Sequence, residues 1–224
     1  MSSLHRLLVP LAAAVLIGIG ASPAAAHGFS STVYAGVTTD GGGTVRTTLE
    51  LEYDLFVVSA ADFRADDGLF REGTAAFEAD DTVGQAAALD AHAAAAVGYV
   101  TERFTVAAGG EACVPARAGG FRMGTRENVP YTTLVLDWTC PGTTGHALRS
   151  ALFPASEDYV RETRTLVTYD IDGRSGTATL DAAAPELSIG HSPAALWYLL
   201  IPLIPAALGW WLWRRRRSSG VRNQ

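Results

Sequence analysis

The chain has 224 residues and a formal net charge of −6 at pH 7, with 17 basic residues against 23 acidic ones. Every basic residue is arginine, and the stretch between residues 27 and 190 holds 11 of them together with all 23 acids, a formal charge of −12. Such a surface repels phosphate backbones, which argues against nucleic acid as a partner and leaves cations or basic proteins.

Residues 1–26 have the three parts of a secretory signal peptide. His5 and Arg6 precede an apolar run over residues 7–20, and a series of small residues ends at Ala26. The run is too short for an ordinary membrane span, and the final alanines form an A-x-A cleavage site. The sequence therefore predicts export and a mature chain that begins with residue 27.

Alternating apolar and polar residues predict a mainly β extracytoplasmic domain over residues 27–190. The clearest case is residues 45–53, where Leu49 and Leu51 share one face and charged side chains the other, the period of a half-buried strand. Turn residues before it and a strand candidate at 29–37 predict an opening hairpin. Further strands are expected at residues 104–107, 131–140, 163–171 and 176–180. Strands separated by Gly and Pro favour a β-sandwich.

One alanine-rich stretch, residues 82–103, breaks the strand pattern. Its larger apolar residues recur at spacings of three and four, which is typical of a helix with one buried face. This stripe consists of Leu89, Ala93, Val97, Val100 and Phe104. Asp81 or Thr82 can cap its start. We expect a single helical insertion that packs on the sandwich.

A charge-free stretch over residues 194–213 predicts a transmembrane helix. Its length matches the hydrocarbon thickness, tryptophans lie near both ends, and four arginines follow directly. By the positive-inside rule, residues 214–224 form a cytoplasmic tail. Pro202 and Pro205 remove backbone donors in lipid, so the helix is either kinked or packed against a partner. We therefore expect a single-pass plasma-membrane protein whose N-terminal domain lies outside the cytoplasm.

Cys113 and Cys140 are the only cysteines. In an exported chain they predict a disulfide, which would stabilise the fold by roughly 3–4 kcal/mol in the chain-entropy model. A two-cysteine metal site is the alternative, but no C-x-x-C spacing supports it. Trp138 lies beside the second cysteine rather than in the immunoglobulin position, so the sequence predicts nothing finer than a sandwich.

Enzyme signatures are missing from the sequence, which has no G-x-S-x-G elbow, H-E-x-x-H motif, P-loop or dinucleotide fingerprint. Residues 173–176 predict a hairpin turn and not a nucleophile elbow. The acid pairs Asp66-Asp67 and Asp80-Asp81 resemble general acids or cation ligands, but adjacent acids in polar segments are usually solvated. The sequence favours a non-enzymatic protein, with a hydrolase that collects His146 and several carboxylates as an alternative.

His27 is the main candidate for a metal ligand. Cleavage after Ala26 would leave a free α-amino group beside the His27 imidazole, so one residue would offer two nitrogen ligands. Such a chelate suits Cu(II) or Ni(II), and an amine that titrates near pH 8 is easily deprotonated. The alternative is that His27 is merely the first residue after an ordinary cleavage site.

A two-nitrogen chelate needs further ligands, and the other histidines and the carboxylates are the candidates. His146 follows Gly145 in a predicted loop and is the preferred second ligand. His92 is expected to be exposed, beside Ala96 and off the apolar stripe of the helix. His191 comes three residues before the predicted span.

Four segments of the predicted ectodomain, residues 27–31, 49–55, 99–104 and 168–172, resemble the extracytoplasmic N-terminal region of actinobacterial HupE/UreJ-like membrane proteins. The similarity covers roughly residues 27–187. In that family the exported region precedes a multi-helix membrane domain associated with uptake of nickel or related metals. A single predicted span replaces that domain here. The resemblance therefore implies an accessory ectodomain that handles metal or binds a partner, not a transporter.

Together these features predict a membrane-anchored, extracytoplasmic, non-enzymatic binding domain, accessory to transition-metal (Ni, Cu or Co) handling. The alternative is an interaction or structural module that docks another envelope membrane protein through its acidic face or its proline-bearing helix.

Overall fold

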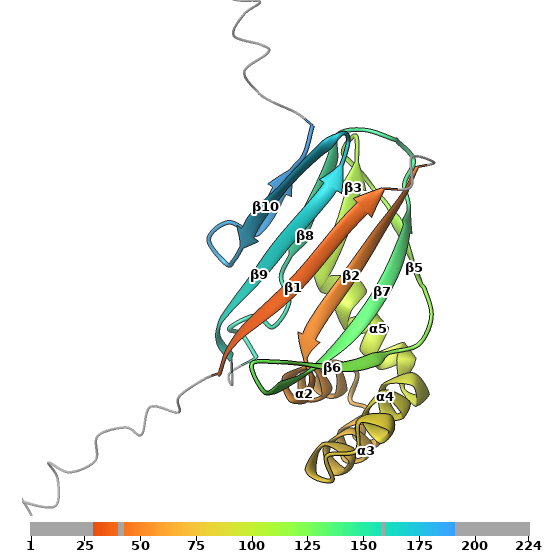
Figure 1. Cartoon of the computed structure of the whole chain (residues 1–224), viewed down its shortest axis with the longest axis vertical. Helices are drawn as coiled ribbons and strands as arrows, with labels where there is room; N and C mark the ends of the chain where they lie inside the picture. The colour runs from red at the N-terminus through yellow and green to blue at the C-terminus, as the bar shows by residue number, and fades with distance from the viewer. Residues whose placement is uncertain (1–28, 40–42, 158–159, 191–224) are drawn as a thin grey trace, which may run out of the picture.

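The computed structural model describes residues 29–39, 43–157 and 160–190, which form a mainly β domain with two sheets and four helices (Figure 1). The predicted signal peptide, the charge-free stretch 194–213 and the arginine-rich tail lie outside these residues. Among the helices that are described, none has both the length and the apolar character needed to cross a membrane.

The larger sheet is built around the hairpin of β1 and β2, which confirms the predicted opening hairpin. β9 pairs with β1 in parallel and continues into β10, while β7 lies beside β2 and holds β5 and β6 along its other edge. The seven strands are β1 (Phe29–Thr39), β2 (Thr44–Glu52), β5 (Val114–Arg117), β6 (Arg122–Arg126), β7 (Val129–Thr139), β9 (Val160–Ile171) and β10 (Arg174–Leu180).

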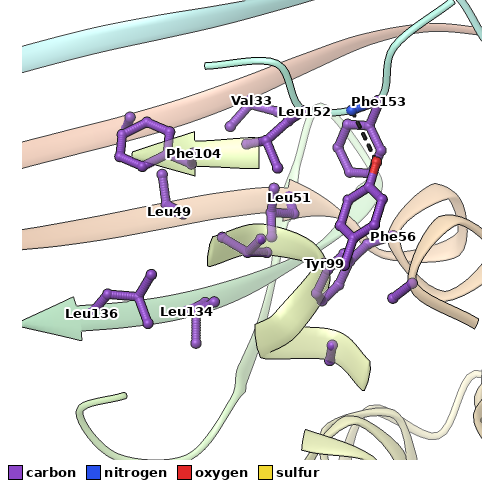
Figure 2. Packing of buried hydrophobic residues seen from close by; sticks show 14 of the residues in the cluster. Val33, Leu49, Leu51, Phe56, Tyr99, Phe104, Leu134, Leu136, Leu152 and Phe153 are labelled. Atoms are coloured by element: carbon purple, nitrogen blue, oxygen red, sulfur yellow. Dashed lines mark hydrogen bonds between the residues drawn. The ribbon is translucent and has the colours of Figure 1, made fainter. Parts of the chain in front are cut away.

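The smaller sheet has the strand order β11-β8-β3-β4 and packs on one face of the larger one. The Phe104 and Trp138 rings meet between the sheets with centroids 6.3 Å apart, and the hydroxyls of Ser150 and Thr165 are 2.7 Å apart. Figure 2 shows Phe104 in this core with Leu49 of β2. The four strands are β3 (Phe104–Ala108), β4 (Glu111–Ala112), β8 (His146–Ser150) and β11 (Glu186–Ser188).

Four helices connect β2 to β3 and gather at one end of the sheets (Figure 1). They are α2 (Tyr53–Arg64), α3 (Asp67–Glu78), α4 (Thr82–Ala91) and α5 (Ala93–Arg103). The expectation of a single helix over residues 82–103 was wrong. The backbone of His92, with φ −106° and ψ 33°, ends α4 and begins α5, and two further helices precede them.

The face that α5 buries differs in part from the predicted stripe. Ala96 and Tyr99 are fully buried, whereas Ala93 and Val97 of the predicted stripe are only half-buried. Leu89, Val100 and Phe104 of the predicted stripe are buried, so the stripe was right in part. Small residues on this face allow α5 to lie close to α2 in the core.

The helices and the C-terminal end of the described chain lie at opposite ends of the domain (Figure 1). α5 leads into β3 at Phe104, while Ala108 at the far end of that strand pairs with His146. Ile189 donates its backbone N–H to the His146 carbonyl, and Gly190 lies against Gly145. The chain therefore leaves the domain at the end away from the helices.

Candidate functional site

The Cys113–Cys140 disulfide is present and confirms the predicted pairing. Cys140 follows β7 and Cys113 precedes β5, so the bond joins the ends of two neighbouring strands. As predicted, Leu136 and Trp138 lie buried on one face of β7, and Cys140 is partly buried against the same core. The role of these cysteines is structural.

His146 does not lie in a loop, because it is the first residue of β8 and its side chain is 1% exposed. Its Nδ1 is 2.8 Å from Oδ1 of Asp172, which is also buried. The other oxygen of Asp172 accepts backbone N–H groups of Gly145 and His146 at 3.0 and 3.2 Å. The His146 Nε2 is buried and has no hydrogen-bond partner among the described residues.

This arrangement does not by itself form a metal site. Over residues 29–39, 43–157 and 160–190, no three His, Cys, Asp or Glu side chains are grouped to hold an ion. His146 and Asp172 are only two, and the core encloses them. His27 and His191 lie outside the described residues, so the pairing of His27 with His146 stays a prediction, and the described residues alone do not fit a Cu(II) or Ni(II) centre.

His92 is not simply exposed, as its place on the predicted helix suggested. Its Nδ1 is 2.9 Å from Asp66 Oδ2, its Nε2 is 3.4 Å from Glu72 Oε2, and its side chain is 20% exposed. The Asp66 carboxylate also accepts the Leu69 N–H at 3.0 Å and caps α3. That backbone hydrogen bond, with a contribution from His92, holds the pKa of Asp66 below its usual value. The contact joins α3 to the junction of α4 and α5.

The second acid pair also caps a helix. The Asp81 carboxylate accepts the backbone N–H groups of Val83 and Gly84 at 3.1 and 2.9 Å, as its position before α4 predicted. In each acidic pair, one member therefore has a local structural role in starting a helix.

A buried polar network fixes α5 to the loop before β9. The Tyr99 hydroxyl accepts the Phe153 N–H at 2.9 Å, drawn as a dashed line in Figure 2, and donates to Glu157 Oε1 at 3.1 Å. Ser59 of α2 donates to the other Glu157 oxygen at 2.8 Å, and Arg103 lies 3.3 Å from Oε1. Burial, together with the Glu157 charge, raises the pKa of Tyr99. The network holds the helices on the sheets.

An apolar groove opens at the surface between α2 and α3, with a volume of ≈ 320 Å³. Phe70, Val58 and Phe77 form its walls, and Phe70 is 47% exposed, one of the most exposed large apolar side chains in the described part of the chain. Apolar grooves between helices are places where another molecule can bind. This α2–α3 groove is the candidate functional site.

The groove exists because α2 and α3 approach closely at Gly73. A Cβ at Gly73 would lie 2.8 Å from Val57 Cγ1, so only glycine fits there without displacement. The Tyr53 hydroxyl donates to the Gly73 carbonyl at 3.2 Å, and the Tyr53 ring stacks on Phe77 with centroids 6.0 Å apart. The start of α2 therefore lies beside the end of α3, and the two helices run in opposite directions.

Carboxylates mark one end of the α2–α3 groove. Asp54 in the first turn of α2 and Glu78 at the end of α3 both line it. Residues 53–103, which form the helices and their connections, contain ten acidic residues and three arginines. The helical segment thus carries a formal charge of −7, more than half of the −12 of residues 27–190. Neither α2 nor α3 was predicted, although Leu69, Gly73 and Phe77 have the spacing of a helix face.

A second, open hollow of ≈ 630 Å³ lies on the outer face of the larger sheet around Gly36. Threonines of β2, β9 and β10 line it, and Arg126 covers one end, where its guanidinium stacks over Tyr34 at 3.9 Å from the ring centroid and pairs with Glu50. Outward hydroxyl side chains are common on strands, so this surface is a weaker candidate for a functional site than the α2–α3 groove.

No protein-family model matches the sequence, and no curated protein is significantly similar to it. The resemblance to HupE/UreJ-like ectodomains thus stays a prediction.

Proposed function

We propose that this protein is a membrane-anchored, extracytoplasmic, non-enzymatic binding domain, in which a β-sandwich presents a helical end to another envelope protein. The α2–α3 groove is the main observation that supports this proposal. It combines exposed Phe70 with half-buried Val58 and Phe77 in one apolar surface. Burial of such a surface against a partner is the usual driving force for protein association.

The position of the groove supports a protein partner. Residue 190 lies at the opposite end of the domain, beside Gly145, and four residues before the charge-free stretch that we propose as the membrane anchor. An anchor there would direct the helical end away from the bilayer, where a protein can reach it. The predicted anchor and the observed groove therefore both favour a protein partner at the helical end.

Crosslinking in cells tests this function directly. A photoreactive amino acid would replace Phe70 in the full chain, expressed in its native host, and a matched variant would carry it at Val114, which is 68% exposed on β5. We expect a discrete protein adduct from position 70 and none from position 114. Equal yields at the two positions, or no adduct at position 70, would contradict docking at the groove.

Transition-metal handling is a separate proposal that depends on the N-terminal chelate of His27. We expect Cu(II) or Ni(II) to bind the mature chain more tightly than a chain with one Ala added before His27, because the addition moves the free amine away from the imidazole. Isothermal titration compares them, with His27→Ala as the control. Equal affinities of all three chains would contradict the chelate hypothesis and would leave the proposal of docking at the groove unchanged.

A further inference from the structure

We infer that the α2–α3 groove binds a short amphipathic helix of a partner protein, with arginine or lysine at the end that meets Asp54 and Glu78. This inference rests on the proposed docking function and deepens it, because it specifies the chemistry of the segment that docks.

The shape of the groove favours a helix. Its α3 wall extends from Phe70 to Glu78, about two turns or 12 Å of helix. A helix laid along two antiparallel helices places side chains at i, i+3 or i+4, and i+7 against such a groove. Phe70, with Val58 across from it on α2, provides the apolar surface that these anchors would cover.

The negative charge at one end of the groove predicts a positive charge on the partner segment. Asp54 and Glu78 lie together because the start of α2 is beside the end of α3, as the stacking of Tyr53 on Phe77 shows. Opposite charges at a rim speed association and exclude partners of like charge. A basic residue at that end of the incoming helix meets both carboxylates.

The same charge argues against two other occupants. A second copy of this chain would bring another helical segment with ten acids and three arginines against the first, so like charges would face each other. An anionic membrane surface would meet the same repulsion. The helices α2 and α3 that line the groove also lie at one end of the domain (Figure 1), opposite Gly190, which precedes the proposed anchor in the sequence.

Peptide binding to the full chain in neutral-lipid nanodiscs tests the inference. The probe is a fluorescent helix of about three turns, with leucines at i, i+3, i+4 and i+7 and arginines at one end. One control peptide has glutamate in place of arginine, and a second has the same composition with the leucines distributed around the helix. By fluorescence anisotropy we expect the basic amphipathic peptide to bind at least about tenfold more tightly than either control.

Variants of the protein locate the binding. We expect Phe70→Ser to weaken the basic peptide at least about tenfold, while Val83→Ser, which removes an exposed apolar side chain of α4 outside the groove, leaves it unchanged. Glu78→Arg should move the preference toward the glutamate peptide, and Glu111→Arg on β4 should not. Circular dichroism would verify that each variant is folded.

Equal binding of basic and acidic peptides, or an unchanged affinity in Phe70→Ser, would overturn the inference. If the crosslink from position 70 forms in cells while these peptides fail, the docking function stands and the helix assignment is wrong. A crosslink that joins two copies of this chain would also overturn it, in favour of self-association.

Discussion

At the residue scale, a buried pair with Asp172 defines the environment of His146. The glycine before it suggested a loop, yet His146, Leu148 and Ser150 are all buried at alternate positions, the period of a strand. Its partner Asp172 follows β9, and no local pattern relates the two. The prediction of an accessible His146 was therefore wrong, because the fold buries its side chain.

The His146–Asp172 pair should contribute measurably to stability. We expect His146→Leu to lower the free energy of unfolding by about 3 kcal/mol, because Asp172 would keep only its backbone donors in a buried position. Asp172→Asn should cost less, about 1 kcal/mol, since an amide oxygen still accepts those N–H groups and asparagine tolerates the φ of 57° at this position. Urea unfolding of the full chain in detergent, followed by circular dichroism, measures both. A smaller loss in His146→Leu than in Asp172→Asn would contradict this account.

Tyr53 predicts a loss of stability at high pH. Burial raises the pKa of Tyr53 to about 12, whereas an unfolded tyrosine titrates near pH 10. The fold therefore favours the neutral phenol, and this contribution is complete below about pH 10 and is lost as pH rises toward about 12. Unfolding measured across that window should show a falling free energy with a shallower slope in Tyr53→Phe. A slope identical to that of the parent protein would show that Tyr53 is not responsible.

At the element scale, the success of prediction depended on whether a segment buries one face or several. β2 and β7 have one buried face each, and both were found within two residues of their observed ends. α2 has no such simple pattern, since Leu55, Phe56 and Val57 are buried in succession. β5 and β6 are mainly exposed edge strands, so they lack the apolar alternation that marks a strand. The α2–α3 groove could not be predicted because neither of its helices was recognised.

The crossing of α2 and α3 can be tested with two matched glycine substitutions. We expect Gly73→Ala to lower the free energy of unfolding by about 1–3 kcal/mol, because its Cβ would meet Val57 at 2.8 Å in a packed contact. Gly98→Ala in α5 should be neutral or stabilising by up to about 1 kcal/mol, since its Cβ meets only the movable end of Arg64 and alanine favours a helix. Thermal unfolding of both variants gives the comparison. Equal effects would mean that Gly73 is no tighter than an ordinary helix position.

At the scale of the whole molecule, sequence patterns identified the mainly β class and the disulfide but not the order in which the strands pair or their division between two sheets. The parallel pairing of β1 with β9 joins the first strand to one near the end of the domain, and such a pairing leaves no mark on either strand alone. The packing of one sheet on the other likewise depends on contacts between strands that are well separated in the sequence, such as that of Phe104 with Trp138. Composition gives the charge of the domain. The hydropathy of the two ends of the chain predicts that the domain lies outside the cytoplasm.

The predicted topology gives a final test that covers both ends of the chain. Phe70→Cys places a thiol on the exposed helical end, and Ser218→Cys places one after the four arginines, while Cys113 and Cys140 are held in their disulfide. If residues 194–213 span the membrane with the arginines inside, a membrane-impermeant maleimide should label position 70 in intact spheroplasts and position 218 only after permeabilisation. The parent chain serves as the unlabelled control. Labelling of position 218 in intact spheroplasts, with position 70 protected, would reverse the orientation and remove the reason for expecting an extracytoplasmic partner at the groove.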